Sequence, residues 1–194
     1  MKKVVLVVLA VMCFASISFA GGGLGLKLGG AQNDPKTLEE LFDYYGGELT
    51  KGYGIFALEG FYEWDREKGK IGLRFGFDFY GDNELKVGYG KITETTYAIP
   101  LTLYYKWDKG IKAWSGYLGG GLTYINTEIE VGADEDSESK FFPHIVGGLE
   151  YRFTKVFALG FEGKYNMAAK VKKDGDVYSD RSGISGALVG RFYF

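Results

Sequence analysis

The 194-residue sequence has only three prolines and a single cysteine, and charge of one sign does not dominate it. One cysteine cannot close an intramolecular disulfide, so the framework that stabilises many small exported domains is absent. No apolar run of 18 residues follows the N-terminal segment, which excludes a helical membrane protein. Because 23 basic residues stand against 25 acidic ones, composition gives no general case for binding nucleic acid.

Glycine and aromatic residues are abundant instead, with 31 Gly, 15 Tyr, 15 Phe and 3 Trp. Average glycine usage is about 7 %, so this chain has roughly twice the usual share. Glycine-rich chains are often disordered, but disorder requires low hydrophobicity and few aromatics. With 46 % hydrophobic residues, the chain does not fit that class. Its length and composition predict one β-rich domain punctuated by glycine.

Residues 1–20 predict a cleaved secretory signal peptide. Two lysines precede an apolar stretch at 4–14, and Ser18-Phe19-Ala20 is a small-x-small cleavage site. The only cysteine lies within this segment, so the mature domain at 21–194 is expected to contain none. Export without disulfides means that stability must come from the core or from a membrane.

Nearly every stretch after residue 21 alternates apolar and polar side chains with a period of two, which indicates β-strands. The segments last about 9 to 14 residues, whereas the usual globular strand has about 5 to 6. A tilted strand that crosses a bilayer needs about 9 to 11 residues. The eight predicted segments are 22–30, 54–64, 70–80, 95–107, 113–126, 141–153, 156–168 and 182–194.

Each segment has an apolar face and an opposite face that carries glycine, small residues and charge. Leu101, Leu103 and Tyr105, for example, share one face. The alternation of the two faces (the parity of each residue) is compatible with two kinds of barrel. A lipocalin-like barrel encloses its apolar face, whereas a membrane barrel turns that face to lipid and pairs charges inside. The charges on the opposite faces are Lys27, Glu59, Glu63, Arg74, Asp78, Lys106, Glu150, Arg152, Glu162, Lys164 and Arg191.

The lengths of the connections favour the membrane barrel. Short turns at one end and long loops at the other are typical of outer-membrane barrels, and long and short links alternate throughout this chain. The long links are 31–53, 81–94, 127–140 and 169–181, and the short ones are 65–69, 108–112 and 154–155.

Aromatic residues gather beside the short links. Trp64, Trp107 and Trp114, which are all the tryptophans of the chain, flank them, with Phe153 and Tyr193 at the same level. Amphipathic rings favour the membrane–water interface, so we expect these five side chains to form an interfacial belt.

The chain resembles the small eight-stranded outer-membrane β-barrel family, the relatives of the membrane domain of outer membrane protein A. The resemblance implies an all-β fold, an eight-stranded antiparallel up-and-down transmembrane barrel in a bacterial outer membrane. Phe194, with Phe192 two residues before it, is similar to the signal read by the barrel-insertion machinery. The segments that carry the resemblance are 99–105, 117–124, 146–153 and 190–194.

Family resemblance does not fix one activity, because such barrels serve as anchors, adhesins, lipid-modifying enzymes or narrow pores. Barrel lipid A deacylases place a Ser two residues from a His on one strand face, but Val146 stands at that place relative to His144. We therefore expect no catalytic residue, and no metal site or cofactor, since His and Cys clusters are lacking.

The interior charges have two interpretations, a small aqueous pore or a plug of paired charges. Eight strands leave an interior that side chains just fill, and unpaired charges there are costly, so balanced signs favour the plug. The sequence predicts a non-enzymatic protein with a structural or surface-interaction role. A narrow pore or small-solute binder is the first alternative, and a lipid-modifying enzyme the second.

The long links carry their own signals. Thr37 to Glu40 is a capping-box pattern followed by the apolar periodicity of a short helix, which packs either over the barrel mouth or on the lipid surface. The third link is acidic and is expected to be a solvated loop. Lys170, Lys172 and Lys173 of the fourth are expected to meet either lipopolysaccharide phosphates or the acidic third link, and an extracellular partner is expected at these loops.

Pro100 falls inside a predicted strand, where it cannot donate to the sheet ladder. A β-bulge or a position at the rim is expected there.

Overall fold

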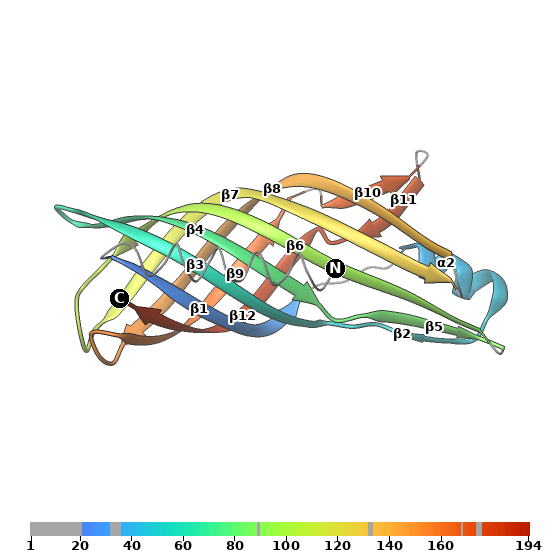
Figure 1. Ribbon diagram of the computed structural model, residues 1–194, viewed down its shortest axis with the longest axis horizontal. Coiled ribbons are helices and arrows are strands. Elements are labelled where there is room, and N and C mark those ends of the chain that lie inside the picture. Colours follow the sequence, from blue (N-terminus) through green and yellow to red (C-terminus); the bar gives the residue numbers. More distant parts are fainter. Residues whose placement is uncertain (1–20, 32–35, 89, 132–133, 168, 174–175) are drawn as a thin grey trace.

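Eight antiparallel strands close into a single barrel in the computed structural model (Figure 1). The predicted signal peptide lies outside the described residues. The structure describes residues 21–31, 36–88, 90–131, 134–167, 169–173 and 176–194. The barrel strands are β1 (Gly22–Ala31), β3 (Gly54–Arg66), β4 (Gly69–Tyr80), β6 (Gly90–Trp107), β7 (Trp114–Val131), β8 (Asp134–Arg152), β9 (Phe157–Asn166) and β12 (Gly183–Tyr193).

Each strand pairs with its neighbour along the chain, and β12 pairs with β1 to close the ring. A closed ring has no edge, so every strand of the barrel has a partner on both sides. The eight-stranded antiparallel barrel predicted from alternation is confirmed.

The two ends of the barrel differ, as the link lengths predict. One end, called the short-turn end, holds the tight connections β3–β4, β6–β7 and β8–β9 together with the C-terminus (Figure 1). The other, the long-loop end, carries the remaining elements. These are α2 (Lys36–Tyr45), β2 (Glu48–Thr50), β5 (Asn83–Val87), β10 (Lys170–Lys173) and β11 (Asp176–Asp180).

The predicted acidic loop at 127–140 is largely strand, so that expectation is wrong. β7 and β8 stay paired up to Val131 opposite Asp134, and β6 pairs with β7 as far as Ile92. Beyond residue 126 polar residues occupy both faces of this hairpin, so the apolar–polar alternation fades although the pairing continues. The side chains of Asp134 and Glu135 lie outside what the structure describes.

The charged face of the strands turns inward and the apolar face outward. Leu101 and Leu103 are 50 % and 58 % exposed, whereas Thr102 between them is 1 % exposed. This alternation explains the unexceptional mean hydropathy of −0.09, which averages two opposite faces.

Of the two arrangements expected for Pro100, a bulge is not present. The β4–β6 ladder keeps one register on both sides of it, Phe75 with Leu101 and Asp78 with Ala98, but two positions between them are unpaired. Pairing with β7 continues through Pro100 opposite Thr123. The missing N–H is therefore accommodated by a local gap in one ladder.

The predicted helix is present as α2, and it packs on other elements of the long-loop end. It lies against β2, β5 and β11, with Leu38 fully buried. Of the two placements left open, the structure shows packing at the barrel end. Phe42 and Tyr45 remain 37 % and 61 % exposed, so the apolar face of the helix is only partly covered. The side chain of Thr37 lies outside the description. No described helix is long and apolar enough to cross a membrane.

Candidate functional site in the barrel lumen

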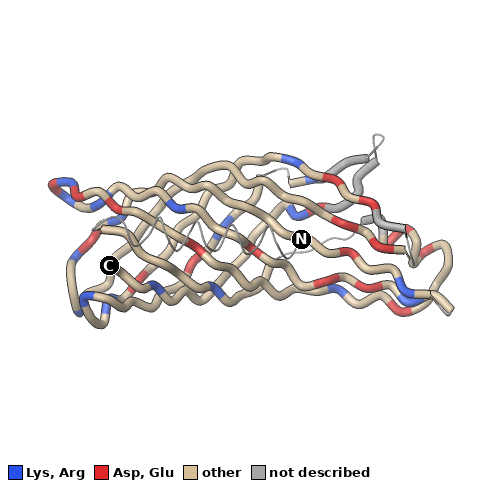
Figure 2. The backbone as a smooth tube through the Cα atoms, viewed as in Figure 1, with Lys and Arg blue, Asp and Glu red and all other residues tan. Residues whose placement is uncertain are grey.

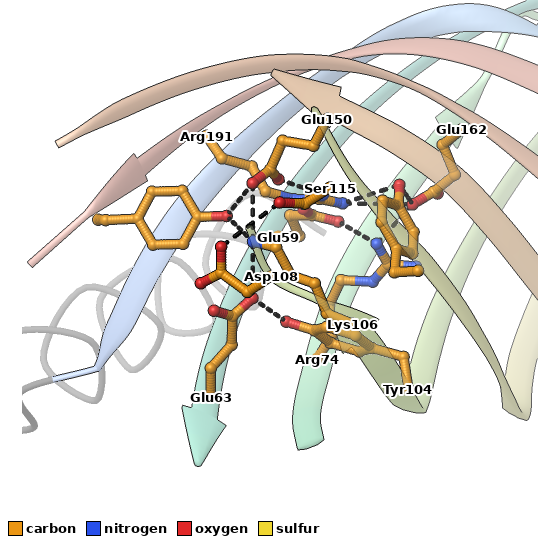
Figure 3. Close-up of polar contacts among 12 residues, drawn as sticks. Glu59, Glu63, Arg74, Tyr104, Lys106, Asp108, Ser115, Glu150, Glu162 and Arg191 are labelled. Atoms are coloured by element: carbon orange, nitrogen blue, oxygen red, sulfur yellow. Dashed lines mark hydrogen bonds and ion pairs between the residues drawn. The ribbon is translucent and has the colours of Figure 1, made fainter. Parts of the chain in front are cut away.

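The lumen is centred on Arg191 of β12. Its Nε lies 2.7 Å from Glu59 Oε1, and its Nη1 lies 2.9 Å from Glu150 Oε2. The third nitrogen, Nη2, lies 3.3 Å from Glu162 Oε2 and donates to the Tyr117 hydroxyl at 3.2 Å. The guanidinium therefore joins carboxylates from three different strands (Figure 3).

Two further cations share the same carboxylates. Lys27 Nζ lies 2.7 Å from both Glu59 and Glu162. Arg74 Nη1 lies 3.3 Å from Glu59 and 2.5 Å from Glu162. Burial of charge is tolerated when partners and hydrogen bonds surround it, and here three cations surround two carboxylates. Contacts across the lumen thus tie β1, β3, β4, β9 and β12 together.

A second group lies next to the first, toward the short-turn end. Lys106 Nζ lies 2.7 Å from Glu150 Oε1 and 3.2 Å from Glu63 Oε1. It also donates to the Tyr193 hydroxyl at 2.7 Å, and that hydroxyl donates to Glu150 at 2.6 Å. Tyr104 donates to Glu63 at 3.0 Å (Figure 3).

Tyr193 corrects one expectation. It was predicted to lie in the interfacial belt, but it is 7 % exposed and points into the lumen. Its position follows from parity, because it stands two residues after Arg191 on the same strand. The ring also stacks with the Arg152 guanidinium, whose central carbon lies 3.9 Å from the ring centroid.

Asp108 closes the short-turn end of this chain of contacts. It accepts a hydrogen bond from the Gly110 N–H at 2.9 Å and lies 3.4 Å from Lys70 Nζ and 3.9 Å from Arg152 Nη1. Burial acts to raise the pKa of Asp108, but the Gly110 hydrogen bond and the nearby cations outweigh it and lower the pKa below its ordinary value of 3.8.

Toward the long-loop end the lumen becomes less charged. Lys164 Nζ pairs with Asp78 at 2.5 Å. His144 lies between two threonines, with Nε2 2.9 Å from Thr102 Oγ1 and Nδ1 2.9 Å from Thr123 Oγ1. Beyond them a buried apolar cluster crosses the lumen, made of Ile55, Ala57, Tyr80, Ala98, Ile125, Ile129, Phe142 and Ala169.

One buried ion pair at the long-loop end was missed. Arg181 Nη2 lies 3.1 Å from Glu94 Oε1 and donates to Thr96 at 2.9 Å, and the Arg181 side chain is fully buried. Glu94 has the inward parity of Thr96 and Lys106, so extending the alternation of β6 backward would have found it. The link lengths instead predict loops at 81–94 and 169–181, where Glu94 and Arg181 lie.

Glycines make the space that these side chains occupy. A Cβ at Gly72 would stand 2.2 Å from the Tyr104 ring, and one at Gly148 would stand 2.4 Å from the Tyr117 ring. Atoms do not approach so closely, so larger residues at either position would displace a ring that bonds a lumen carboxylate.

The structure brings together most of the charges singled out from the sequence. Ten of the eleven are buried, and Arg152 is half-buried at the short-turn end. Among the described residues, no three His, Cys, Asp or Glu side chains are placed to hold a metal ion. Trp64, Trp107, Trp114 and Phe153 face outward at the short-turn end, and Phe192 and Phe194 also face outward.

Two comparisons with known proteins support the barrel fold, one with protein-family models and one with solved structures. The model of the family described as outer membrane protein beta-barrel domain matches residues 4–192. Among curated protein sequences no significant match is found. The match to the family model thus covers nearly the whole chain.

Similar solved structures are small barrels. Neisserial surface protein A is 15 % identical with a TM-score of 0.60, and the alignment covers 90 % of this chain and 98 % of that one. Ail of Yersinia pestis, solved with the heparin analogue sucrose octasulfate, is 14 % identical with a TM-score of 0.56, covering 90 % and 99 %. The N-terminal barrel of Pseudomonas aeruginosa OprF is 14 % identical with a TM-score of 0.51, covering 90 % and 98 %.

Proposed function

The chain belongs to the outer membrane protein beta-barrel domain family, and we propose that it is a non-enzymatic envelope protein whose lumen is plugged by paired charges. Family membership indicates the bacterial outer membrane as its location. In this proposal residues 1–20 are removed on export and 21–194 form the barrel. The short-turn end faces the periplasm and the long-loop end faces outward, as in other barrels of this kind.

The observation that carries the proposal is the sharing of partners in the lumen. Arg191, Lys27 and Arg74 contact the same two carboxylates, and Lys106 links the next two. An ion that entered would have to separate buried pairs, which costs several kcal/mol. Toward the long-loop end a second barrier follows, because the apolar cluster and the buried Arg181–Glu94 pair against its Tyr80 ring occupy the lumen.

An enzymatic role has less support. The only histidine is bonded to threonine hydroxyls through both nitrogens. Val146, which stands where a deacylase-like nucleophile would be, is apolar and 1 % exposed. The lumen therefore contains no described Ser–His–acid arrangement around His144.

The long-loop end is proposed to meet an extracellular partner, but not a polyanion of the kind bound to Ail. The four long links hold 17 acidic and 9 basic residues. A sulfated polymer would be repelled by this excess, which favours a cationic or neutral partner. Outer-membrane lipid and lipopolysaccharide are expected around the apolar band, and recognition of Phe192 and Phe194 by the insertion machinery stays a prediction.

Planar-bilayer recording tests the plug. We expect the purified protein to insert without discrete conductance steps, and Arg74→Gln to leave the trace unchanged in the same salt. Arg66→Gln, at an exposed turn, is the matched control for loss of one charge. Regular channel steps in the wild type, altered by Arg74→Gln but not by Arg66→Gln, would establish the narrow pore instead.

A further inference from the structure

The short-turn end carries cations that the lumen does not use. Residues 64–70, 107–114 and 152–157 contain seven basic and three acidic side chains, the reverse of the long-loop end. Figure 2 shows basic positions gathered at the short-turn end and acidic ones more densely at the other. Five of these cations, here called the basic rim, are exposed: Arg66, Lys68, Lys109, Lys112 and Lys155.

The cations of the basic rim outnumber the acidic residues around them, and no described ion pair holds them. Among the described residues, none of its five side chains forms an ion pair, whereas Lys70 and Arg152 beside them turn to Asp108. At the long-loop end, by contrast, the exposed Lys86 and Lys91 form ion pairs with Glu48 and Glu84. The rim therefore presents positive charge to whatever surrounds this end.

The aromatic residues show what surrounds it. Trp64 precedes Arg66 and Lys68, Trp107 and Trp114 bracket Lys109 and Lys112, and Phe153 precedes Lys155. The four rings are 41–54 % exposed on the outer face. Outward rings of this kind sit at headgroup depth in a membrane. Each cation follows a ring by a few residues, which places it at or just beyond the lipid headgroups.

We propose that the basic rim binds the anionic headgroups of phospholipids in the periplasmic leaflet, chiefly phosphatidylglycerol or a diphosphatidyl lipid. Its cations come from three separate turns spread around the barrel, so they contact lipid on most sides. A lysine near an anionic membrane surface gains attraction that falls off within a Debye length. The proposal concerns the outside of the barrel and is independent of whether the lumen conducts.

The chain contains its own probe, because all three tryptophans lie at this end. Their fluorescence, quenched by brominated lipids in reconstituted vesicles, reports the lipid that surrounds the rim. We expect brominated phosphatidylglycerol to displace unlabelled phosphatidylcholine with a relative association constant roughly three- to five-fold above that of brominated phosphatidylcholine at low salt. In 0.5 M salt the ratio should fall toward one.

Two triple variants separate the rim from net charge. Lys68→Gln, Lys109→Gln and Lys155→Gln together remove one cation from each turn, and we expect them to bring the lipid ratio close to one. Lys86→Gln, Lys91→Gln and Lys140→Gln remove the same charge from the long-loop end and should leave the ratio as in the wild type. Heat-modifiable migration on detergent gels checks that both variants form barrels.

Equal quenching of the wild-type protein by the two lipids overturns the proposal. An equal fall of the lipid ratio in both triple variants does so too. So does retention of the detergent-solubilised protein on peptidoglycan sacculi through the rim lysines without any lipid preference. That result would mean that the basic rim binds peptidoglycan, the anionic wall polymer, instead of lipid.

Discussion

Two buried arginines in this barrel are held in different ways. All three nitrogens of Arg191 contact carboxylates, and those carboxylates bind Lys27 or Lys106 as well. Arg181, at the long-loop end, bonds Glu94 and Thr96 through Nη2, and its Nε and Nη1 have no hydrogen-bond partner among the described residues. Both side chains are nearly inaccessible, so the difference lies in their partners and not in burial.

The comparison shows what shared partners contribute. A buried pair gains from Coulomb attraction but loses hydration, and the balance is favourable when every donor and acceptor is used. Around Arg191 the guanidinium fork matches several carboxylates at once. Around Arg181 the ring of Tyr80, 5.2 Å from the guanidinium carbon, supplies only a cation–π contact. We therefore expect the two ends of the lumen to differ in stability.

The largest effect is expected from Arg191→Met, which leaves three buried carboxylates short of a partner. Removal of one member of a buried ionic group costs about 3–5 kcal/mol, so the free energy of unfolding should fall by that amount. Urea titration of the protein in lipid vesicles, followed by tryptophan fluorescence, measures it. Arg191→Lys keeps the charge but not the fork and should recover only part of the loss.

A matched control for that variant is Arg66→Met in vesicles of phosphatidylcholine alone, which removes an exposed cation with no described ion pair and no anionic lipid to contact. Its unfolding free energy should stay within about 0.5 kcal/mol of the wild type. If Arg191→Met were equally mild, the shared contacts in the lumen would contribute little and the comparison would collapse.

A smaller loss is expected from Arg181→Met. One charged pair and one hydrogen bond are removed instead of contacts with three carboxylates, so the cost should lie near the lower end of the range for a buried ionic group, at about 2–3 kcal/mol. Lys170→Met is the control, because the Lys170 side chain is exposed and its pair with Asp180 at 3.4 Å is worth about 0–1 kcal/mol. An effect as large as that of Arg191→Met would mean that partner number does not determine the stability of these sites.

The sequence predicts the first arginine and not the second, for a physical reason. Within the bilayer the outer face must be apolar, so alternation is strong and Arg191 stands out between Gly190 and Phe192. Beyond the bilayer the outer face is wet, polar residues occupy both faces, and period two fades although the strands continue. Glu94 and Arg181 lie there, and so does the acidic hairpin at 127–140, for which the sequence predicts a loop.

Parity also shows where a broader assumption failed. The interfacial belt is predicted from how close each aromatic residue lies to a short turn. Trp64 and Trp114 face outward as this predicts, but Tyr193 has inward parity and lies in the lumen. The partners of each charge were not predictable either. Which carboxylate meets Arg74 depends on strand tilt and stagger around the barrel, and these are not encoded in any one strand.

The smallest effect is expected at the short-turn end, where Asp108 lies in the turn before β7. Its pKa is lowered in the folded protein, so it stabilises the fold above its ordinary pKa of 3.8, and this contribution disappears as pH falls through the lower folded pKa. At pH 7, Asp108→Asn should cost about 0.5–1 kcal/mol, because the contacts with Lys70 and Arg152 are long and partly solvated. The difference between variant and wild type, measured by urea titration from pH 7 downward, should shrink only below pH 4. An amide oxygen also accepts the hydrogen bond from the Gly110 N–H, so that bond cancels in the difference. A difference that does not change with pH would therefore show that the charge of Asp108 adds nothing to stability at this end.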